Sequence, residues 1–201
     1  MGRTSTARER LLDAACDLLR TRGYADVGVA EICARADVRK GSFYHFFESK
    51  QALTLEVVDA HWHRQRADWL ATLRAPDRPA LARLEELFRS LTGIQRATQE
   101  EHGAVSGCLL ANLALELPAQ EQPVRDRLAA VFAEEVDLVQ AALAEAAAEG
   151  TVRAGAADRD TARAAVAQME GMVLFAKVTD DPAVLDGLWP QVSRLFGVRG
   201  N

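Results

Sequence analysis

Apolar residues recur every three or four positions along nearly the whole chain, which is the spacing of helices that bury one face. In the first such segment Thr6 and Glu9 form a capping-box pair, and Gly23 ends the helix. Pro190 falls inside the last segment and is expected to kink it. No alternating strand pattern competes, so we expect an all-α fold. The predicted helices cover 6–22, 28–35, a third within 37–50, then 50–74, 79–99, 107–117, 123–149, 158–179 and 182–196.

Two short helices follow the longer first one and are separated by the tight turn Ala36-Asp37-Val38. This order describes a helix-turn-helix unit, whose second short helix lies in the major groove of DNA. We therefore expect a DNA-binding domain over residues 1–48 and a larger helical body over residues 49–201.

The expected recognition helix lies in "DVRKGSFYHFFESK", residues 37–50, which places aromatic rings beside cations. Gly41 has no side chain to hold the backbone away from DNA, and Tyr44 can donate a hydrogen bond to a phosphate oxygen. The three phenylalanines cannot all face water, so some must pack inward. The alternative reading is a core aromatic cluster on an ordinary helix. The polar candidates are Arg39, Lys40, Ser42, Tyr44 and His45.

The charge of the chain is unevenly distributed. The formal net charge is −5, but residues 1–50 hold nine Lys/Arg against seven Asp/Glu, for +2, and the remainder carries −7. A weakly basic head on an acidic body is compatible with binding a polyanion through the head, although many solvated faces are equally basic.

Cysteine usage and the N-terminus indicate a protein of the reducing cytosol. The three cysteines, Cys16, Cys33 and Cys108, form neither a zinc spacing nor a disulfide framework. The N-terminus has no apolar core of a signal peptide, and no run of about 18 apolar residues would span a membrane. A cytoplasmic location without membrane contact is expected.

The stretch "VAEICARADVRKGSFYHFFESKQAL" resembles the signature of TetR-type transcriptional repressors, and the resemblance covers residues 8–55. It implies a three-helix DNA-binding head, a ligand-binding and dimerisation body, and a homodimer that reads a palindromic operator in double-stranded DNA. Val27-Gly28 replaces the family's usual Thr-Ser, so these two side chains should not inherit a phosphate-binding role. Asp37 replaces the usual turn glycine and tolerates a left-handed backbone. By resemblance, the DNA contacts are Arg39, Lys40, Gly41, Ser42, Tyr44, His45 and Lys50.

The last predicted helix carries a continuous apolar stripe, which suggests a dimer interface. Gly171 and several alanines in the preceding helix would permit close packing, so two copies of these helices would form a four-helix interface. Packing of the stripe against the chain's own core is the alternative. The stripe consists of Leu185, Leu188, Trp189, Val192, Leu195 and Phe196.

The stretch "VSGCLLANLALEL" (105–117), with "GSFYHFF" and "AK" at 176–177, resembles a branch of the family that includes electrophile-, reactive-chlorine- and acrylate-responsive repressors. Cys108 falls in the first turn of its predicted helix, where a thiolate is favoured. Lys177 lies on the stripe of Val166, Met169 and Val173. The resemblance implies that Cys108 and Lys177 approach each other and sense a small-molecule or electrophile effector. Alternatively, Cys108 is a small buried hydrophobe and Lys177 reaches solvent.

Other candidate sites are less specific. Trp62 and Trp69 share a face of their helix and would line a ligand pocket or belong to ordinary core. His61 and His63 lie on different faces, so no metal site or cofactor is expected. An α-helical enzyme would need a nucleophile–base pair, a metal cluster or a phosphate loop, and none is visible. We therefore expect a regulator rather than an enzyme, with a DNA-independent helical scaffold as the alternative.

Overall fold

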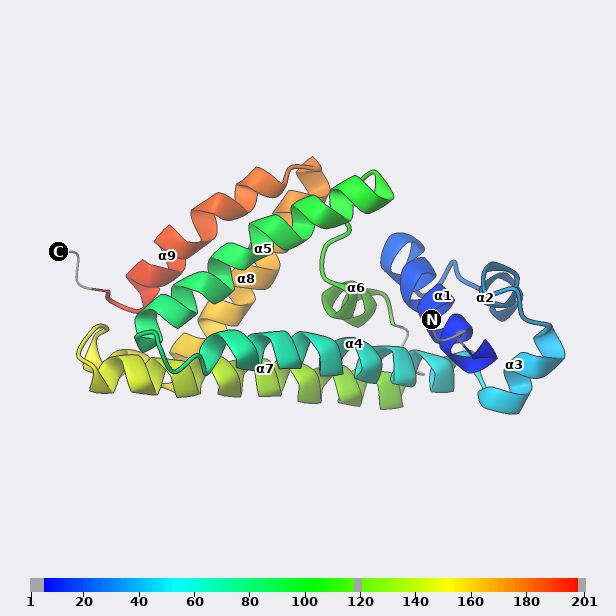
Figure 1. The fold of residues 1–201 in the computed structure, drawn as a ribbon, viewed down its shortest axis with the longest axis horizontal. Helices are drawn as coiled ribbons and strands as arrows, with labels where there is room; N and C mark the ends of the chain where they lie inside the picture. The colour runs from blue at the N-terminus through cyan, green and yellow to red at the C-terminus, as the bar shows by residue number, and fades with distance from the viewer. Residues whose placement is uncertain (1–5, 118–120, 199–201) are drawn as a thin grey trace. The chain divides into compact units, whose positions relative to one another are not determined.

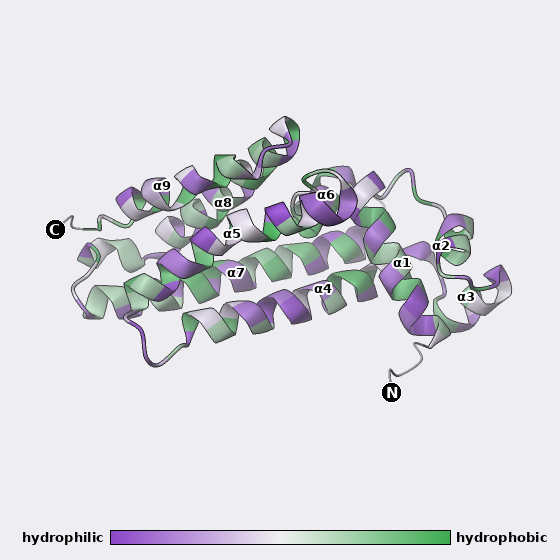
Figure 2. Cartoon of the chain, turned by 45° about the horizontal axis from the view of Figure 1, so that its top comes forward, coloured by the Kyte–Doolittle hydropathy of each residue, from purple (hydrophilic) through white to green (hydrophobic). Residues whose placement is uncertain are grey.

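The computed structural model describes residues 6–117 and 121–198, and in these ranges the regular elements are helices, as the apolar periodicity predicts (Figure 1). Figure 2 shows polar and apolar residues mixed along each helix, as expected where one face is buried. The elements are α1 (Ala7–Arg22), α2 (Val29–Arg35), α3 (Lys40–Phe46), α4 (Lys50–Leu73), α5 (Ala80–His102), α6 (Leu109–Glu116), α7 (Gln122–Ala148), η1 (Ala154–Ala157), α8 (Arg159–Thr179), η2 (Pro182–Gly187) and α9 (Leu188–Leu195).

The chain divides into two compact units. The first comprises Met1–His63 and Leu109–Ala130, and the second comprises Arg64–Cys108 and Val131–Asn201. The long helices α4 and α7 each contribute residues to both units. This division follows packing, whereas the boundary predicted after residue 48 concerns function and stays a prediction. We call the helices α1–α3 the head and the second unit the body.

Local polar signals set the helix ends where the sequence predicted them. The Thr6 hydroxyl accepts a hydrogen bond from the Glu9 amide (3.2 Å), and the Glu9 carboxylate accepts one from the Thr6 amide (2.7 Å). Asp158 caps α8 by accepting from the Thr161 amide (2.7 Å). Asp37 adopts the left-handed conformation expected of it, with φ of 52°. These contacts satisfy amides that have no partner inside the helix.

The head is held together by a small apolar core. The side chains of Leu11, Ile32 and Phe43 have no exposed surface, and each comes from a different helix of the head. Arg10 of α1 donates through Nε to the carbonyl oxygen of Ala36 (3.1 Å), which fastens the turn between α2 and α3. Apolar burial and this turn together fix where α3 lies against α1 and α2.

The body has a larger core to which α5, α7, α8 and α9 all contribute. Its aromatic centre is formed by Phe88, Trp189 and Phe196, whose ring centroids lie 6.1–6.3 Å apart. Such ring pairs add to the stabilisation from burial alone.

The C-terminal segment differs from its prediction in two ways. Instead of one helix over 182–196, a 3-10 helix (η2) precedes α9, which begins at Leu188. Pro190 therefore lies in the first turn of α9, where its missing amide costs nothing, and the expected interior kink is wrong.

The apolar stripe of this segment is also buried by the chain's own core, so its assignment to a dimer interface is wrong. Leu188, Val192 and Phe196 have no exposed surface, and Trp189 is only 8% exposed. Leu185 is buried beside α8, and Leu195 packs against the body core. Periodicity shows that a face is buried without showing what covers it.

Smaller differences concern helix bounds. Helix α5 continues to His102, beyond the predicted end near residue 99, and α6 begins at Leu109 instead of 107. The proline predicted to end α6, Pro118, lies outside the described residues. Among the described residues, no helix has both the length and the apolar character needed to cross a membrane.

Candidate nucleic-acid interface and sensing site

Helix α3 is anchored by two phenylalanines and presents its remaining surface to solvent. Phe43 is fully buried and Phe47 is 2% exposed, as expected for aromatic residues that pack inward. Their rings lie 5.7 Å apart, and the Arg8 guanidinium lies 5.4 Å from the Phe47 ring centroid. The predicted contact residues Arg39, Lys40, Gly41, Ser42, Tyr44 and His45 are all exposed.

The absence of a side chain at Gly41 is not required by the fold. A Cβ atom built at this position would meet nothing within 4 Å, and its φ is not in the left-handed region. Gly41 is the second residue of α3, so the fold would accept a side chain in this first turn. An external partner that approaches the backbone here would explain why glycine is used.

Lys50 differs from the other predicted contacts because its ammonium group has partners within the first unit. It donates to the carbonyl oxygen of Tyr24 and lies 3.9 Å from that ring centroid. Burial lowers the pKa of Lys50, while the negative charge of Glu121 opposes this shift. A phosphate contact would require the side chain to leave Tyr24.

The start of α2 shows the effect of Val27-Gly28 in place of the Thr-Ser that is usual in the family. Val27 is buried (1% exposed), and Gly28 occupies the N-cap position without a side-chain hydrogen bond. Helix α2 therefore begins without the hydroxyl cap that Thr-Ser would provide.

Cys108 lies directly before α6, at its N-cap position, one residue earlier than the predicted place in the first turn, and the effect of the helix start on its thiol stays a prediction. The side chain is half-buried and packs on a small apolar cluster that includes Val173 and Ala176 of α8. Lys177, the next residue along α8, is also half-buried. Both predicted sensing residues therefore belong to the body. Cys108 packs against the C-terminal part of α8, and Lys177 lies in that part of the helix.

Two glutamates, the buried Glu135 and the half-buried Glu170, accompany Cys108. Glu135 of α7 has no exposed surface, and in the described structure neither of its carboxylate oxygens has a hydrogen-bond partner. Burial, together with the charge of Glu170 on α8, raises the pKa of Glu135 to about 8. Burial raises the pKa of Glu170 to about 7, although a hydrogen bond from the Cys108 thiol opposes this rise. We call Glu135 and Glu170 the acid pair.

The acid pair was not identified from the sequence, although the positions of the two glutamates among buried residues indicated it. Glu135 stands among the buried residues Val131 and Val139 of α7, at a helical spacing where an apolar residue would be expected. Glu170 likewise follows the buried Met169 on α8. A carboxyl group on a buried stripe usually has a partner or a raised pKa.

The remaining candidates are buried or half-buried packing residues. Trp69 (5% exposed) belongs to the body core, and Trp62 (2% exposed) is buried in the first unit. In the head, Cys33 is buried and Cys16 is half-buried. Within 6–117 and 121–198, no group of three His, Cys, Asp or Glu residues is placed to hold a metal ion.

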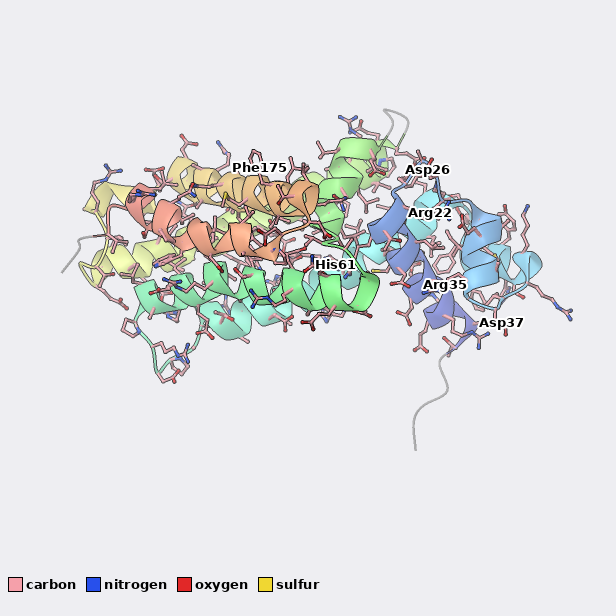
Figure 3. The ribbon with its side chains drawn as sticks, turned by 90° about the horizontal axis from the view of Figure 1, so that it is seen from above. Arg22, Asp26, Arg35, Asp37, His61 and Phe175 are labelled. Carbon is pink, nitrogen blue, oxygen red and sulfur yellow. The ribbon has the colours of Figure 1, made fainter. Side chains whose placement is uncertain are left out.

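Helix α8 also leaves an apolar face in solvent. Leu174, Phe175 and Val178 are 48%, 61% and 74% exposed, and Phe175 is marked on α8 in Figure 3. Ala164 and Ala167 are exposed at helical spacing on the same helix. Large apolar side chains gathered on one face are typical of an interaction surface.

Comparison with known proteins gives matches over both halves of the chain. The family described as bacterial regulatory proteins, tetR family, matches residues 11–57, and the tetracyclin repressor-like C-terminal domain matches residues 80–192.

Individual relatives match over most of the chain. The transcriptional repressor DhaR of Mycobacterium sp. (strain GP1) is 29% identical over 186 residues, covering 92% of this chain and 89% of DhaR. The transcriptional regulator AcuR of Cereibacter sphaeroides is 32% identical over 199 residues, covering 97% and 87%. The reduced form of Escherichia coli NemR superposes with a TM-score of 0.83 at 24% identity, covering 96% of this chain and 99% of NemR.

Proposed function

The chain belongs to the TetR family of bacterial transcriptional regulators, and we propose that it is a repressor that binds a palindromic operator as a homodimer and is released by an effector acting on the body. The family consists of regulators of transcription, and relatives such as DhaR are named as repressors. A DNA-independent scaffold or a small enzyme finds no support in these matches.

The observation that carries the proposal is the exposed surface of α3. Its cationic and hydroxyl side chains face solvent around Gly41, where a Cβ atom would meet nothing within 4 Å. We propose that Arg39 and Ser42 contribute most to base choice, and that Lys40, Tyr44 and His45 bind phosphates. Lys50 would add a further phosphate contact if its ammonium group left the Tyr24 carbonyl oxygen and ring and bound a phosphate oxygen of DNA.

A gel-shift or filter-binding assay on DNA from upstream of the gene tests this function. We expect a specific shift that weakens when Tyr44 is replaced by Ala. The absence of a shift on that DNA, and on the regions upstream of neighbouring genes, would support the scaffold alternative.

The proposed homodimer uses the exposed apolar face of α8. Two copies of Leu174, Phe175 and Val178 would cover each other, and Gly171 with the exposed alanines would let the helices approach closely. Regulators of this family typically act as dimers. Each head of such a dimer would read one half-site of the operator.

We further propose that Cys108 senses electrophiles. The thiol is half-buried and hydrogen-bonded to Glu170 of α8, and Lys177 lies on α8 as well. A structural relative, NemR, has been solved in a reduced form. Modification of Cys108 would add atoms to a packed cluster of the body and so favour a different arrangement of its helices.

Helix α6 and one hydrogen bond connect Cys108 to the loop between α1 and α2. Cys108 precedes α6, and the residue at the other end of α6, Glu116, accepts a hydrogen bond from the Tyr24 amide (2.7 Å) in the loop between α1 and α2. A displacement of α6 would therefore pull on the loop that leads from α1 into α2.

The three cysteines provide matched variants for the sensing proposal. We expect a maleimide to release wild-type protein from operator DNA, because alkylation at Cys108 disturbs the body. Cys16→Ser and Cys33→Ser should respond as wild type does, whereas Cys108→Ser should stay bound. Gel shift with and without the maleimide measures this. If Cys108→Ser still dissociates, a reversible pocket ligand becomes the better account of the effector.

A further inference from the structure

The surroundings of Cys108 argue against a preformed thiolate. Its thiol donates a hydrogen bond to the Glu170 carboxylate, and a negative charge beside a thiol disfavours a second negative charge on sulfur. If Cys108 reacts with electrophiles, its proton must be removed during the reaction.

We propose that the carboxylate of Glu170 is the proton acceptor that activates Cys108. This deepens the proposed sensing function and rests on it. The hydrogen bond already holds the acceptor against the proton to be moved, as general-base catalysis requires. Oε2 of Glu170 is buried and has no hydrogen-bond partner among the described residues, so the carboxyl group has unused capacity to hold a proton.

Burial makes Glu170 a suitable base, because it raises the pKa of this carboxyl group to about 7. Among the groups that act on the acid pair, Cys108 comes from the loop before α6, and the charge of Glu170 on α8 acts on Glu135 on α7. Burial and the charge of Glu170 raise the pKa of Glu135 to about 8, so Glu135 keeps its proton close to neutral pH. Glu170 is then ionised but basic enough to accept a proton.

The reaction with an α,β-unsaturated carbonyl compound is balanced without any oxidant. The sulfur forms a bond to the β-carbon while the S–H bond breaks and its proton moves to Glu170. The electron pair of the C=C bond moves to the α-carbon and carbonyl oxygen as an enolate. The enolate then takes the proton back from Glu170, which leaves a thioether and a regenerated carboxylate.

The test measures alkylation of the full-length chain by acrylamide, with peptide-resolved mass spectrometry so that Cys16 and Cys33 serve as internal references. In wild type, the rate constant at Cys108 should rise with pH through an inflection near 7, where Glu170 ionises. Glu170→Gln should remove that inflection and lower the rate constant at pH 7.5 by about 10-fold or more, because the amide cannot accept the proton. Glu134→Gln, a neutralisation at a partly exposed site on α7, is the matched control and should change neither.

Two results would overturn the proposal. A faster reaction in Glu170→Gln would mean that the carboxylate restrains the thiol, and an unchanged rate and pH profile would make Glu170 a bystander. Glu170→Asp, which keeps the carboxylate, should retain the inflection, and the wild-type profile alone decides the matter if Glu170→Gln does not fold. The readout is independent of DNA, so fast Glu170-dependent alkylation without operator release would refute the sensor and leave the acid–base assignment intact.

Discussion

The burial of Glu135 makes the stability of the body depend on pH. The folded state favours its neutral form, since its pKa is raised from 4.5 to about 8. The stabilisation of the neutral form is therefore complete below about pH 4.5 and is lost as pH rises through 8. Glu170, whose pKa is raised to about 7, acts in the same direction.

We expect the free energy of unfolding of wild type to fall between pH 5 and 8, by on the order of 1 kcal/mol per pH unit. Glu135→Gln should flatten this decline, because the amide stays neutral throughout. Urea denaturation at pH 5, 6.5 and 8 measures both slopes. Parallel slopes for the two proteins would show that Glu135 does not titrate in this range.

Substitutions of Lys40 and Lys50 test whether each of these side chains binds a DNA phosphate. Each phosphate contact contributes about 0.9 to the slope of log affinity against log salt concentration. Lys40→Ala should lower the slope by about one unit and weaken binding to all sequences alike, because Lys40 is exposed on α3.

Lys50→Ala should lower the same slope by about one unit if its ammonium leaves Tyr24 for a phosphate. Salt titrations of operator binding, in parallel with Lys40→Ala, provide the measurement. Weaker binding with an unchanged slope would instead assign Lys50 to the packing of Tyr24 and remove it from the phosphate contacts.

At the scale of elements, helix starts that depend on local polar signals were predictable. The Thr6–Glu9 capping box, the Asp158 cap and the left-handed Asp37 each depend on neighbours within a few residues. The exposed residues of α3 were predictable for the same reason, because Phe43 fixes which face of a short helix points inward.

Features that depend on residues distant in the chain were not predictable. The stripe on η2 and α9 was correctly identified as buried, but its cover is α5 and α8 of the same chain. The hydrogen bond between Cys108 and Glu170 joins two helical regions whose proximity no spacing reveals. Tertiary packing decides both cases.

At the scale of the whole molecule, the proposed dimer interface is the exposed apolar face of α8. Trp189→Glu would place a charge in the body core and destabilise the fold, so it does not report on dimerisation. Phe175→Glu changes an exposed side chain, which the isolated chain tolerates, but it would bury an unpaired charge in the proposed interface.

We expect Phe175→Glu to sediment as a monomer and to lose most operator affinity, because the two half-sites are then bound independently. Ile94→Glu, on a half-exposed apolar residue of α5, is the control and should remain dimeric. Analytical ultracentrifugation distinguishes the two states. A dimeric Phe175→Glu would place the interface elsewhere.

The burial of the tryptophans makes intrinsic fluorescence a selective probe of this protein. The chain has three tryptophans, and Trp62, Trp69 and Trp189 are 2%, 5% and 8% exposed. None of them belongs to α1, α2 or α3. Their emission should therefore be blue-shifted in the native state and respond to repacking around α4 and the body core. Contact between α3 and DNA should leave it nearly unchanged, so one sample can report effector action through tryptophan emission and operator binding through a label on the DNA.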